Sequence, residues 1–388
     1  MFFLKILHIT TDNKFISHAL TTFESVYPNQ NTVWMLSELA EIPIADNNCY
    51  KYFSFSQTFS PIFLRSLENF DLVVLHTFIV SWYPLIFLAP KNTKFAWLGW
   101  GFDYYEYIYN NPKDLLLNKT LKLNDYCIQI NKRKLSLKSL VKYPAKVLAN
   151  RVIKIRALKR ISSFSPVLKE DYDLIANAGL ISSLPDFMPW NYGSLEENLI
   201  KNFIGQRVTG NSILVGNSAS FTNNHIEAFD LLNDFNLQDG IEVITPLSYG
   251  DDCYKHEVIE LGYELLGNSF QPITDFMPID EYIDTIKRCG YVVMNHKRQQ
   301  AVGNIVIMLY LGARVFLREE NPTYKMLKSD GAILHTIQEL ESNPKLLKSR
   351  LGEHEIQKNI DILYKHWSKD AIDNKTKNLV EFHLGEAN

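Results

Sequence analysis

Residues 291–322, YVVMNHKRQQAVGNIVIMLYLGARVFLREENP, decide the fold of this chain. Residues 291–294 predict a strand, residues 295–304 a polar loop, and the apolar residues 305–311 a buried helix that stops at Gly312. Residues 313–317 predict the next strand, which is followed by the polar segment 319–322. This order is that of a βαβ unit, in which ligands bind outside the carboxyl ends of the strands, at helix N-termini.

The loop of this unit carries His296, Lys297, Arg298, Gln299 and Gln300. Cationic side chains together with the free N–H groups of a helix N-terminus suit a phosphate or diphosphate. Two glutamines beside a cation are better suited to hydrogen-bonding a polar ligand than to solubility. The alternative is that the loop is a solvated, functionless connection.

The composition is that of a globular protein. The chain has 388 residues, 46% hydrophobic and 21% charged, with a formal net charge of −3, and it is long enough for two domains. The four cysteines (Cys49, Cys127, Cys253 and Cys289) contain no CxxC pair, so we expect reduced thiols in a cytosolic protein. The apolar start is too short for a signal peptide and is expected to be a buried strand.

Residues 72–89, LVVLHTFIVSWYPLIFLA, have roughly the length of a membrane-spanning helix. His76, Ser81 and Pro84 interrupt the apolar run. We therefore expect a strand, a turn and a short helix here, and no transmembrane helix.

Strand and helix patterns alternate along the whole chain, which predicts an α/β protein with parallel sheets covered on both faces. The segment 184–192, LPDFMPWNY, has two prolines and is expected to link two domains, 1–190 and 191–388, with the last helices packing back on the first. The predicted strands are residues 3–9, 32–36, 50–55, 72–75, 94–98, 162–164, 212–215, 241–244, 270–274, 291–294 and 313–317.

Residues 99–106, GWGFDYYE, follow one of these strands and place two carboxylates, Asp103 and Glu106, at its carboxyl end. Glycines there allow a backbone to approach a ligand closely. The pattern fits an acceptor pocket with a catalytic base, and it fits equally a turn in which the aspartate caps a helix beside packed aromatic rings.

Residues 113–160 contain 14 Lys or Arg and two acidic residues, so this segment carries +12 and the rest of the chain −15. Residues 145–161 mix apolar and cationic side chains as an amphipathic basic helix does, which favours an anionic lipid surface. The cations expected to contact it include Lys146, Arg151, Lys154 and Arg156. We expect no nucleic-acid partner, because no nucleic-acid-binding motif accompanies the charge. A merely solvated helix is the other reading.

Four motifs together resemble glycosyltransferase family 56, the 4-alpha-L-fucosyltransferase family: ILVGNSASFTNNHIEA (213–228), KRQQAVGN (297–304), REENP (318–322) and GWGFDYYE (99–106). The named member of that family transfers N-acetylfucosamine from TDP to lipid II. The resemblance implies a GT-B fold, in which two Rossmann-like domains face each other across a cleft and the C-terminal one binds the nucleotide-sugar. The chain departs from that member in its enlarged basic segment, so the acceptor identity does not carry over.

The resemblance also implies the donor site. Gly216, Asn217 and Ser218 would meet the diphosphate, and Glu320 the hydroxyls of the sugar or ribose. Pro246 and Tyr249 match a loop on which the base would stack. His225 matches a family histidine, and a packing or helix-capping role remains equally open for it. The complete expected donor set is Gly216, Asn217, Ser218, His225, Pro246, Tyr249, His296, Arg298, Gln299, Gln300, Gly303, Asn304, Glu320 and Asn321.

The implied reaction moves a sugar from TDP or UDP to a hydroxyl of a lipid-linked saccharide in bacterial surface polysaccharide assembly. Arg298 and the helix N-terminus after it would stabilise the leaving diphosphate. No DxD triplet in a metal-binding context is present, so we expect no metal and no cofactor. Asp103 is the first candidate for the base and Glu106 the second, ahead of His76 and His18.

The expected location is the cytoplasmic face of the bacterial inner membrane, as a peripheral protein. Two other functions fit the sequence: a non-catalytic scaffold that binds a sugar nucleotide or glycolipid, and another GT-B enzyme such as a sugar-nucleotide epimerase.

Overall fold

The computed structural model describes residues 4–11, 13–37, 50–132, 143–235, 237–238 and 240–385. Two compact units are formed. Unit 1 comprises residues 1–110, 136–194 and 367–388, and unit 2 comprises residues 111–135 and 195–366. The expected domains were 1–190 and 191–388, with the last helices packing back on the first; residues 367–388 do group with unit 1, whereas the boundary falls after residue 194 and residues 111–135 group with unit 2, which was not expected.

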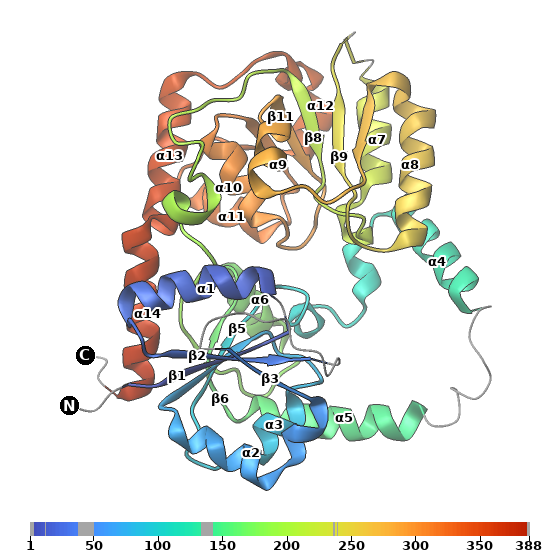
Figure 1. Cartoon of the computed structure of the whole chain (residues 1–388). Helices are drawn as coiled ribbons and strands as arrows, with labels where there is room; N and C mark the ends of the chain where they lie inside the picture. The colour runs from blue at the N-terminus through green and yellow to red at the C-terminus, as the bar shows by residue number, and fades with distance from the viewer. Residues whose placement is uncertain are drawn as a thin grey trace. The chain divides into compact units, whose positions relative to one another are not determined.

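Unit 1 is built on a seven-stranded parallel sheet with strand order β3-β2-β1-β4-β5-β6-β7 (Figure 1). The first six strands in this order follow the doubly wound 3-2-1-4-5-6 arrangement. The strands are β1 (Ile6–Thr10), β2 (Asn31–Leu36), β3 (Tyr50–Phe53), β4 (Leu72–His76), β5 (Phe95–Leu98), β6 (Ile161–Ser165) and β7 (Asp186–Phe187).

Helices cover both faces of this sheet. On one face, α1 and α14 enclose a core of alternate strand residues with Phe23 and Leu379, and on the other α3 packs against α5. Strand β4, LVVLH, is buried along its whole length, as a central parallel strand must be. The helices are α1 (Asn13–Val26), α2 (Pro61–Arg65), α3 (Tyr83–Leu88), α5 (Tyr143–Leu158), α6 (Lys169–Ala178) and α14 (Lys369–Leu384).

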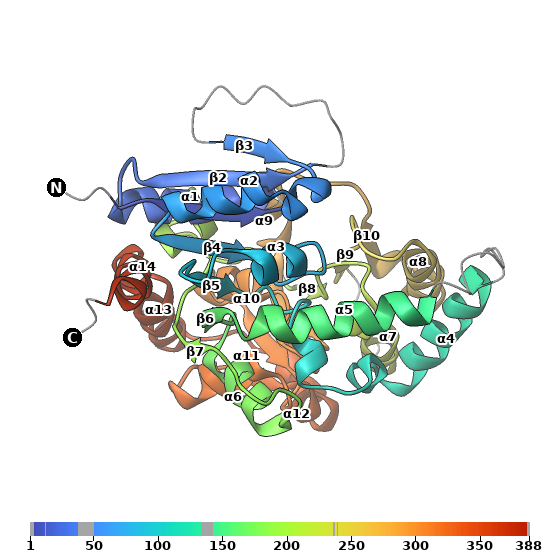
Figure 2. The same cartoon turned by 90° about the horizontal axis from the view of Figure 1, so that it is seen from below.

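Unit 2 repeats this architecture with the order β10-β9-β8-β11-β12-β13, which is again the 3-2-1-4-5-6 arrangement. Figure 2 labels the first three strands of this order, β10, β9 and β8. Its strands are β8 (Ser212–Val215), β9 (Val243–Pro246), β10 (Phe270–Ile273), β11 (Cys289–Met294), β12 (Arg314–Leu317) and β13 (His335–Thr336). Its helices are α4 (Asn118–Lys132), α7 (His225–Asp234), α8 (Asp252–Leu266), α9 (Ile279–Ile286), α10 (Val302–Tyr310), α11 (Pro322–Ser329), α12 (Ile337–Ser342) and α13 (Glu353–Trp367).

The α/β prediction is confirmed, and each of the eleven predicted strands is present within a few residues. The two short edge strands β7 and β13 were not predicted, because two residues carry no readable period. Residues 72–89 form β4 and α3 as expected. No helix in the described part of the chain combines the length and apolar character needed to cross a bilayer.

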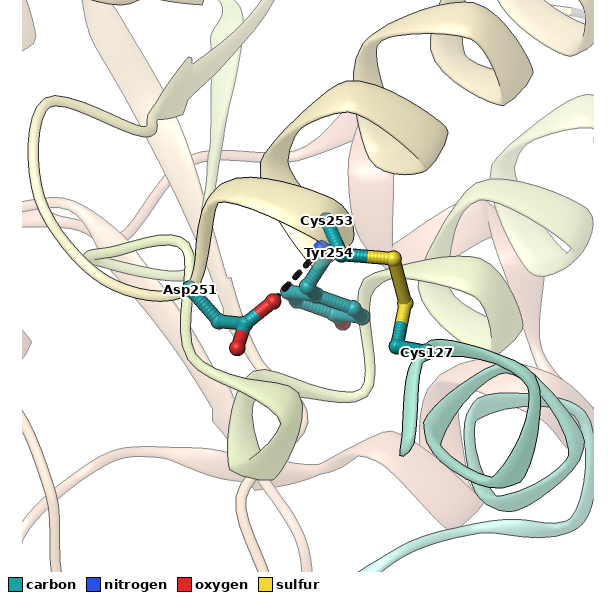
Figure 3. Close-up of a disulfide and its surroundings, with 4 residues drawn as sticks. All are labelled: Cys127, Asp251, Cys253 and Tyr254. Atoms are coloured by element: carbon teal, nitrogen blue, oxygen red, sulfur yellow. Dashed lines mark hydrogen bonds between the residues drawn. A yellow bond between two sulfur atoms is a disulfide. The ribbon is translucent and has the colours of Figure 1, made fainter. Parts of the chain in front are cut away.

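The expectation of reduced cysteines is wrong for two of the four. Cys127 of α4 and Cys253 of α8 form a disulfide across 126 residues of sequence (Figure 3). The sequence gives no sign of this pair, because it is created by the return of residues 111–135 to unit 2. Cys289 is a buried free thiol whose pKa burial raises to about 12, and Cys49 lies outside the described residues.

Candidate donor site

The loop after β8 is shaped around Gly216. This residue has φ +67°, and a Cβ at this position would fall inside the van der Waals distance of the His225 and Asn223 side chains. The Asn223 amide holds the rest of the loop, because its Oδ1 accepts from Asn217 N at 3.0 Å and its Nδ2 donates to Ser218 O at 2.8 Å. A glycine is therefore required where the backbone turns at the end of β8.

Three predicted donor residues from three different strand ends meet above this loop. Gln300 Nε2 donates to Asn217 Oδ1 at 2.9 Å, and Asn217 Nδ2 donates to Tyr249 Oη at 3.1 Å. Thr222 Oγ1 donates to Gln300 Oε1 at 2.6 Å. The carboxyl ends of β8, β9 and β11 are thereby joined into one polar surface, as the topology of a doubly wound sheet requires.

Two fully buried histidines lie beneath this surface. Burial lowers the pKa of His225 to about 3 and, together with the charge of Arg298, holds the pKa of His296 well below its ordinary value. His296 Nε2 lies 2.7 Å from Asn223 Oδ1, and His225 Nδ1 lies 3.2 Å from Tyr254 Oη. The other ring nitrogens, His225 Nε2 and His296 Nδ1, have no hydrogen-bond partner within the described residues. Both rings are neutral.

Helix α10 begins directly after the loop. Ala301 precedes it with φ +57°, a left-handed conformation that costs a non-glycine residue of order 1 kcal/mol and is found most often at functional sites. Gly303 lies in the first turn near Leu199, and Asn304 Nδ2 donates to Tyr282 Oη at 2.9 Å. The first amides of α10 are presented at the carboxyl end of β11.

The cations of the loop have different surroundings. Lys297 Nζ donates to the carbonyl oxygens of Asp114 and Leu116, at 3.1 and 3.3 Å, and so holds the segment that leads into α4. Arg298 is half-buried beside His296, and Gln299 is buried. The phosphate-binding role of Arg298 stays a prediction.

The remaining expected residues are positioned by hydrogen bonds within unit 2. Glu320 Oε1 accepts from Arg318 Nη2 at 3.1 Å and Oε2 from Gln338 Nε2 at 3.0 Å. Asn321 is fully buried: its Oδ1 accepts from Thr323 N, and its Nδ2 donates to the carbonyls of His296 and Arg298. Asn321 thus fixes the loop rather than facing a ligand.

The two residues expected to stack on the base, Pro246 and Tyr249, also differ in their exposure. Pro246 is the buried last residue of β9, whereas the Tyr249 ring is 61% exposed. Only the tyrosine offers a face to a nucleotide base.

Asp103, the first candidate for the base, is 4% exposed in unit 1. Its carboxylate accepts from Trp97 Nε1 at 2.8 Å and from the backbone N–H groups of Phe78 and Trp100 at 2.9 Å. Burial raises its pKa, and these hydrogen bonds oppose the rise. Through these three hydrogen bonds the Asp103 carboxylate links the loop after β4 to the loop after β5. Glu106 is more exposed and pairs with Lys154 at 2.6 Å. The catalytic role of either carboxylate stays a prediction.

A buried polar chain in unit 1 was not foreseen as a unit. His76 Nδ1 lies 2.7 Å from Tyr192 Oη, its Nε2 lies 3.0 Å from His8 Nδ1, and His8 Nε2 lies 3.2 Å from Asn31 Oδ1. Asn31 Nδ2 donates to Glu24 at 2.8 Å. The only signal in the sequence was a histidine in each of two adjacent apolar strands.

Asn223 and Asn224 of the NNH motif were also missed as site-forming residues. Asn224 Oδ1 accepts from Leu117 N at 2.8 Å, and its Nδ2 donates to Asn295 O at 3.0 Å. The asparagine joins the segment before α4 to the donor loops.

The expected membrane contacts lie on α5. Arg151 and Arg156 are exposed, as are Val152 (43%) and Ile155 (48%). Lys154 is turned toward Glu106, and the side chain of Lys146 lies outside the described residues.

This chain is similar to known proteins both in sequence and in fold. A family model described as 4-alpha-L-fucosyltransferase glycosyl transferase group 56 matches residues 195–358, which contain every expected donor residue. The resemblance to family 56 is thereby confirmed for that stretch, and the GWGFDYYE motif lies outside it. The match supports a sugar-transfer reaction.

Solved structures with similar folds are glycosyltransferases. HepE from Anabaena in complex with UDP has 12% identity and a TM-score of 0.61, with 98% of this chain and 100% of that chain covered. A glycosyltransferase from Rickettsia africae has 13% identity and a TM-score of 0.59, with 98% of each chain covered. Trehalose 6-phosphate synthase from Burkholderia multivorans has 8% identity and a TM-score of 0.62, covering 100% and 98%. The fold is GT-B.

Proposed function

We propose that this chain, whose residues 195–358 match glycosyltransferase family 56, transfers a sugar from a nucleoside diphosphate to a hydroxyl of a lipid-linked saccharide in bacterial surface polysaccharide assembly. The observation that carries the proposal is the meeting of Asn217, Tyr249 and Gln300 at three strand ends of unit 2. The donor is a TDP-sugar or UDP-sugar of the deoxyamino or fucose type, and the transfer is of the hexosyl class.

The leaving diphosphate gains negative charge in the transition state. Arg298 and the first amides of α10 lie at the same strand end and supply positive charge and N–H donors to it. Because these groups supply positive charge to the leaving diphosphate, the proposed transfer does not need a divalent ion.

A thermal-shift panel of TDP, UDP, GDP, CMP and NAD, each with and without a chelator, tests the donor site. At a hundredfold excess over its dissociation constant a ligand stabilises by about 2.7 kcal/mol. A selective shift with TDP or UDP that persists in chelator is expected. No shift with any nucleoside diphosphate contradicts the proposal. Release of nucleoside diphosphate from a sugar donor in the presence of acceptor then separates the transferase from a scaffold, which binds without release, and from an epimerase, which returns an isomer of the donor.

Unit 1 takes the acceptor, and α5 brings the protein to the cytoplasmic face of the inner membrane. The exposed pairs Arg151 with Arg156 and Val152 with Ile155 combine charge and apolar area on one short helix. The double variant Arg151→Glu/Arg156→Glu is expected to lose flotation with anionic vesicles. A charge reversal at Lys377, on α14 of the same unit, is the control. Equal flotation of both variants removes α5 from this role.

A further inference from the structure

Three metal-ligating side chains gather at the start of α8, where Asp251 N donates to Ala219 O of the loop after β8 at 2.8 Å (Figure 3). They are the buried Cys127 of α4 and the half-buried Asp251 and Cys253. One sulfur or carboxylate oxygen from each lies within 4.8 Å of the others. The two sulfurs are joined as a disulfide in this structure, and their Cα atoms are 6.0 Å apart.

Two thiolates and one carboxylate form a ligand set that zinc accepts. Zinc binds thiolate sulfur at about 2.3 Å and carboxylate oxygen at about 2.0–2.2 Å in tetrahedral geometry. Tetrahedral angles at those bond lengths place two sulfurs about 3.8 Å apart. Asp251 can add its ligand without giving up its local role: one carboxylate oxygen caps α8 by accepting from Tyr254 N at 2.9 Å, and the second oxygen remains for a metal.

We propose that Cys127, Asp251 and Cys253 bind one zinc ion when the disulfide is reduced, with water as the fourth ligand. A phosphine reductant cleaves the S–S bond to two thiols and is oxidised to the phosphine oxide with oxygen from water. Zinc then displaces the two thiol protons to solvent and forms two Zn–S bonds. The disulfide and the zinc ion are two alternative cross-links between α4 and α8.

The link between Cys127 and Cys253 continues a series of contacts that hold α4 on unit 2. Glu227 accepts from Lys119 N and Thr120 N at 2.7 and 2.9 Å, which caps the start of α4. Lys119 pairs with Asp230 at 2.6 Å. Further along α4, toward its end at Lys132, Leu123 packs on the core of unit 2, and Cys127 is the next fixed point.

The Cys127–Cys253 link also lies next to the donor loops. Tyr254 follows Cys253, and its Oη accepts from His225 N at 3.1 Å. The segment before α4 contacts Asn224 and Lys297. Metal binding at the start of α8 is measured without any sugar substrate, so its test is independent of the test of sugar transfer.

The test uses the full chain, reduced with a phosphine and stripped of metal, and titrated with Co²⁺ as a spectroscopic substitute for zinc. One equivalent is expected to give sulfur-to-cobalt charge-transfer absorption, and zinc is expected to displace it. Cys127→Ser should abolish this absorption. Asp251→Asn keeps the helix cap, because asparagine caps as well as aspartate does, and should weaken binding about tenfold or more.

Cys49→Ser is the matched control, since it removes a thiol but leaves the three ligands in place, and it should bind as the unaltered chain does. If Cys127→Ser does not fold, the comparison of Asp251→Asn with the unaltered chain decides. The proposal is overturned if the reduced chain shows no sulfur-to-cobalt band, or if Cys127→Ser or Asp251→Asn binds Co²⁺ as tightly as the unaltered chain.

Discussion

Asn321 connects the donor loop, residues 296–300, to the start of α11 by hydrogen bonds. It is fully buried, its Oδ1 accepts from Thr323 N at 2.8 Å, and its Nδ2 donates to the carbonyls of His296 and Arg298 at 3.0 and 2.8 Å. Asn321→Ala removes a helix cap, worth about 1 kcal/mol, and leaves two carbonyls without a donor, at about 1 kcal/mol each. We expect the free energy of unfolding of unit 2 to fall by about 3 kcal/mol.

The probe for this measurement is dictated by the sequence. Five of the six tryptophans, at positions 34, 82, 97, 100 and 190, lie within unit 1, and the sixth, Trp367, ends α13 where the chain passes from unit 2 to unit 1, so tryptophan fluorescence reports mainly on unit 1. Urea unfolding of unit 2 is therefore followed by circular dichroism, and the loop by hydrogen exchange of the amides of residues 296–300. Faster exchange and weaker nucleoside-diphosphate binding are expected in Asn321→Ala.

Asn321→Asp is the control that separates the two roles. The aspartate keeps the cap on α11 but turns an oxygen toward the two carbonyls, so the helix should persist while the loop is released. Stability and nucleotide binding equal to those of the unaltered chain, in either variant, would refute the reasoning.

Three further predictions concern other elements. Gly216→Ala should destabilise unit 2 by more than the roughly 1–2 kcal/mol of the left-handed backbone, because the side chains behind it leave no room for a Cβ. The control is Gly179→Ala in unit 1, a left-handed residue (φ +63°, ψ +15°) with nothing within 4 Å, which should show the backbone cost alone in urea unfolding of unit 1. His8 is buried and its pKa is lowered to about 4 from 6.5, so the unfolded chain binds more protons between these values. His8 alone should therefore cost unit 1 about 3 kcal/mol as pH falls from 6.5 to 4, and the buried His76 and His383, whose pKa values are also lowered, add to this loss. A tryptophan-detected urea midpoint independent of pH would contradict this. Reducing the Cys127–Cys253 disulfide without metal should cost unit 2 about 5 kcal/mol, as expected for a loop of 126 residues, and the reductant should have no effect on Cys127→Ser.

The fold could be predicted because its signal is local. Central parallel strands buried on both faces are continuous apolar runs, such as LVVLH in β4, and helices between them end at glycines such as Gly312. The polar residues at the strand ends could be grouped for the same reason, since parallel strands bring their carboxyl ends to one edge.

The division of roles within the site could not be predicted, because it depends on contacts between distant residues. Lys297 looked like a phosphate ligand, but residues 111–117 return to unit 2 and take its ammonium group. Asp103 was predicted as a base, and its carboxylate also accepts from the loop after β4 and from the indole of Trp97, a structural contact that the sequence did not indicate. In both cases the residue type correctly indicated that the side chain makes polar contacts. Only the identity of its hydrogen-bond partner shows whether those contacts hold the fold or serve the reaction.

His296 illustrates how the partners identify a residue that awaits a ligand. The Asn223 amide donates to Ser218 O and Ser220 O, so its oxygen faces His296 and the imidazole donates from Nε2. Because the pKa of His296 is well below its ordinary value, the ring is neutral, and Nδ1 is an acceptor with no donor within the described residues. A buried acceptor without a partner costs about 1–3 kcal/mol, which a bound donor would recover. A hydroxyl of the ribose or sugar would supply the missing donor, which is why His296, rather than the fully bonded Asn321, is the residue of this loop expected to contact the substrate.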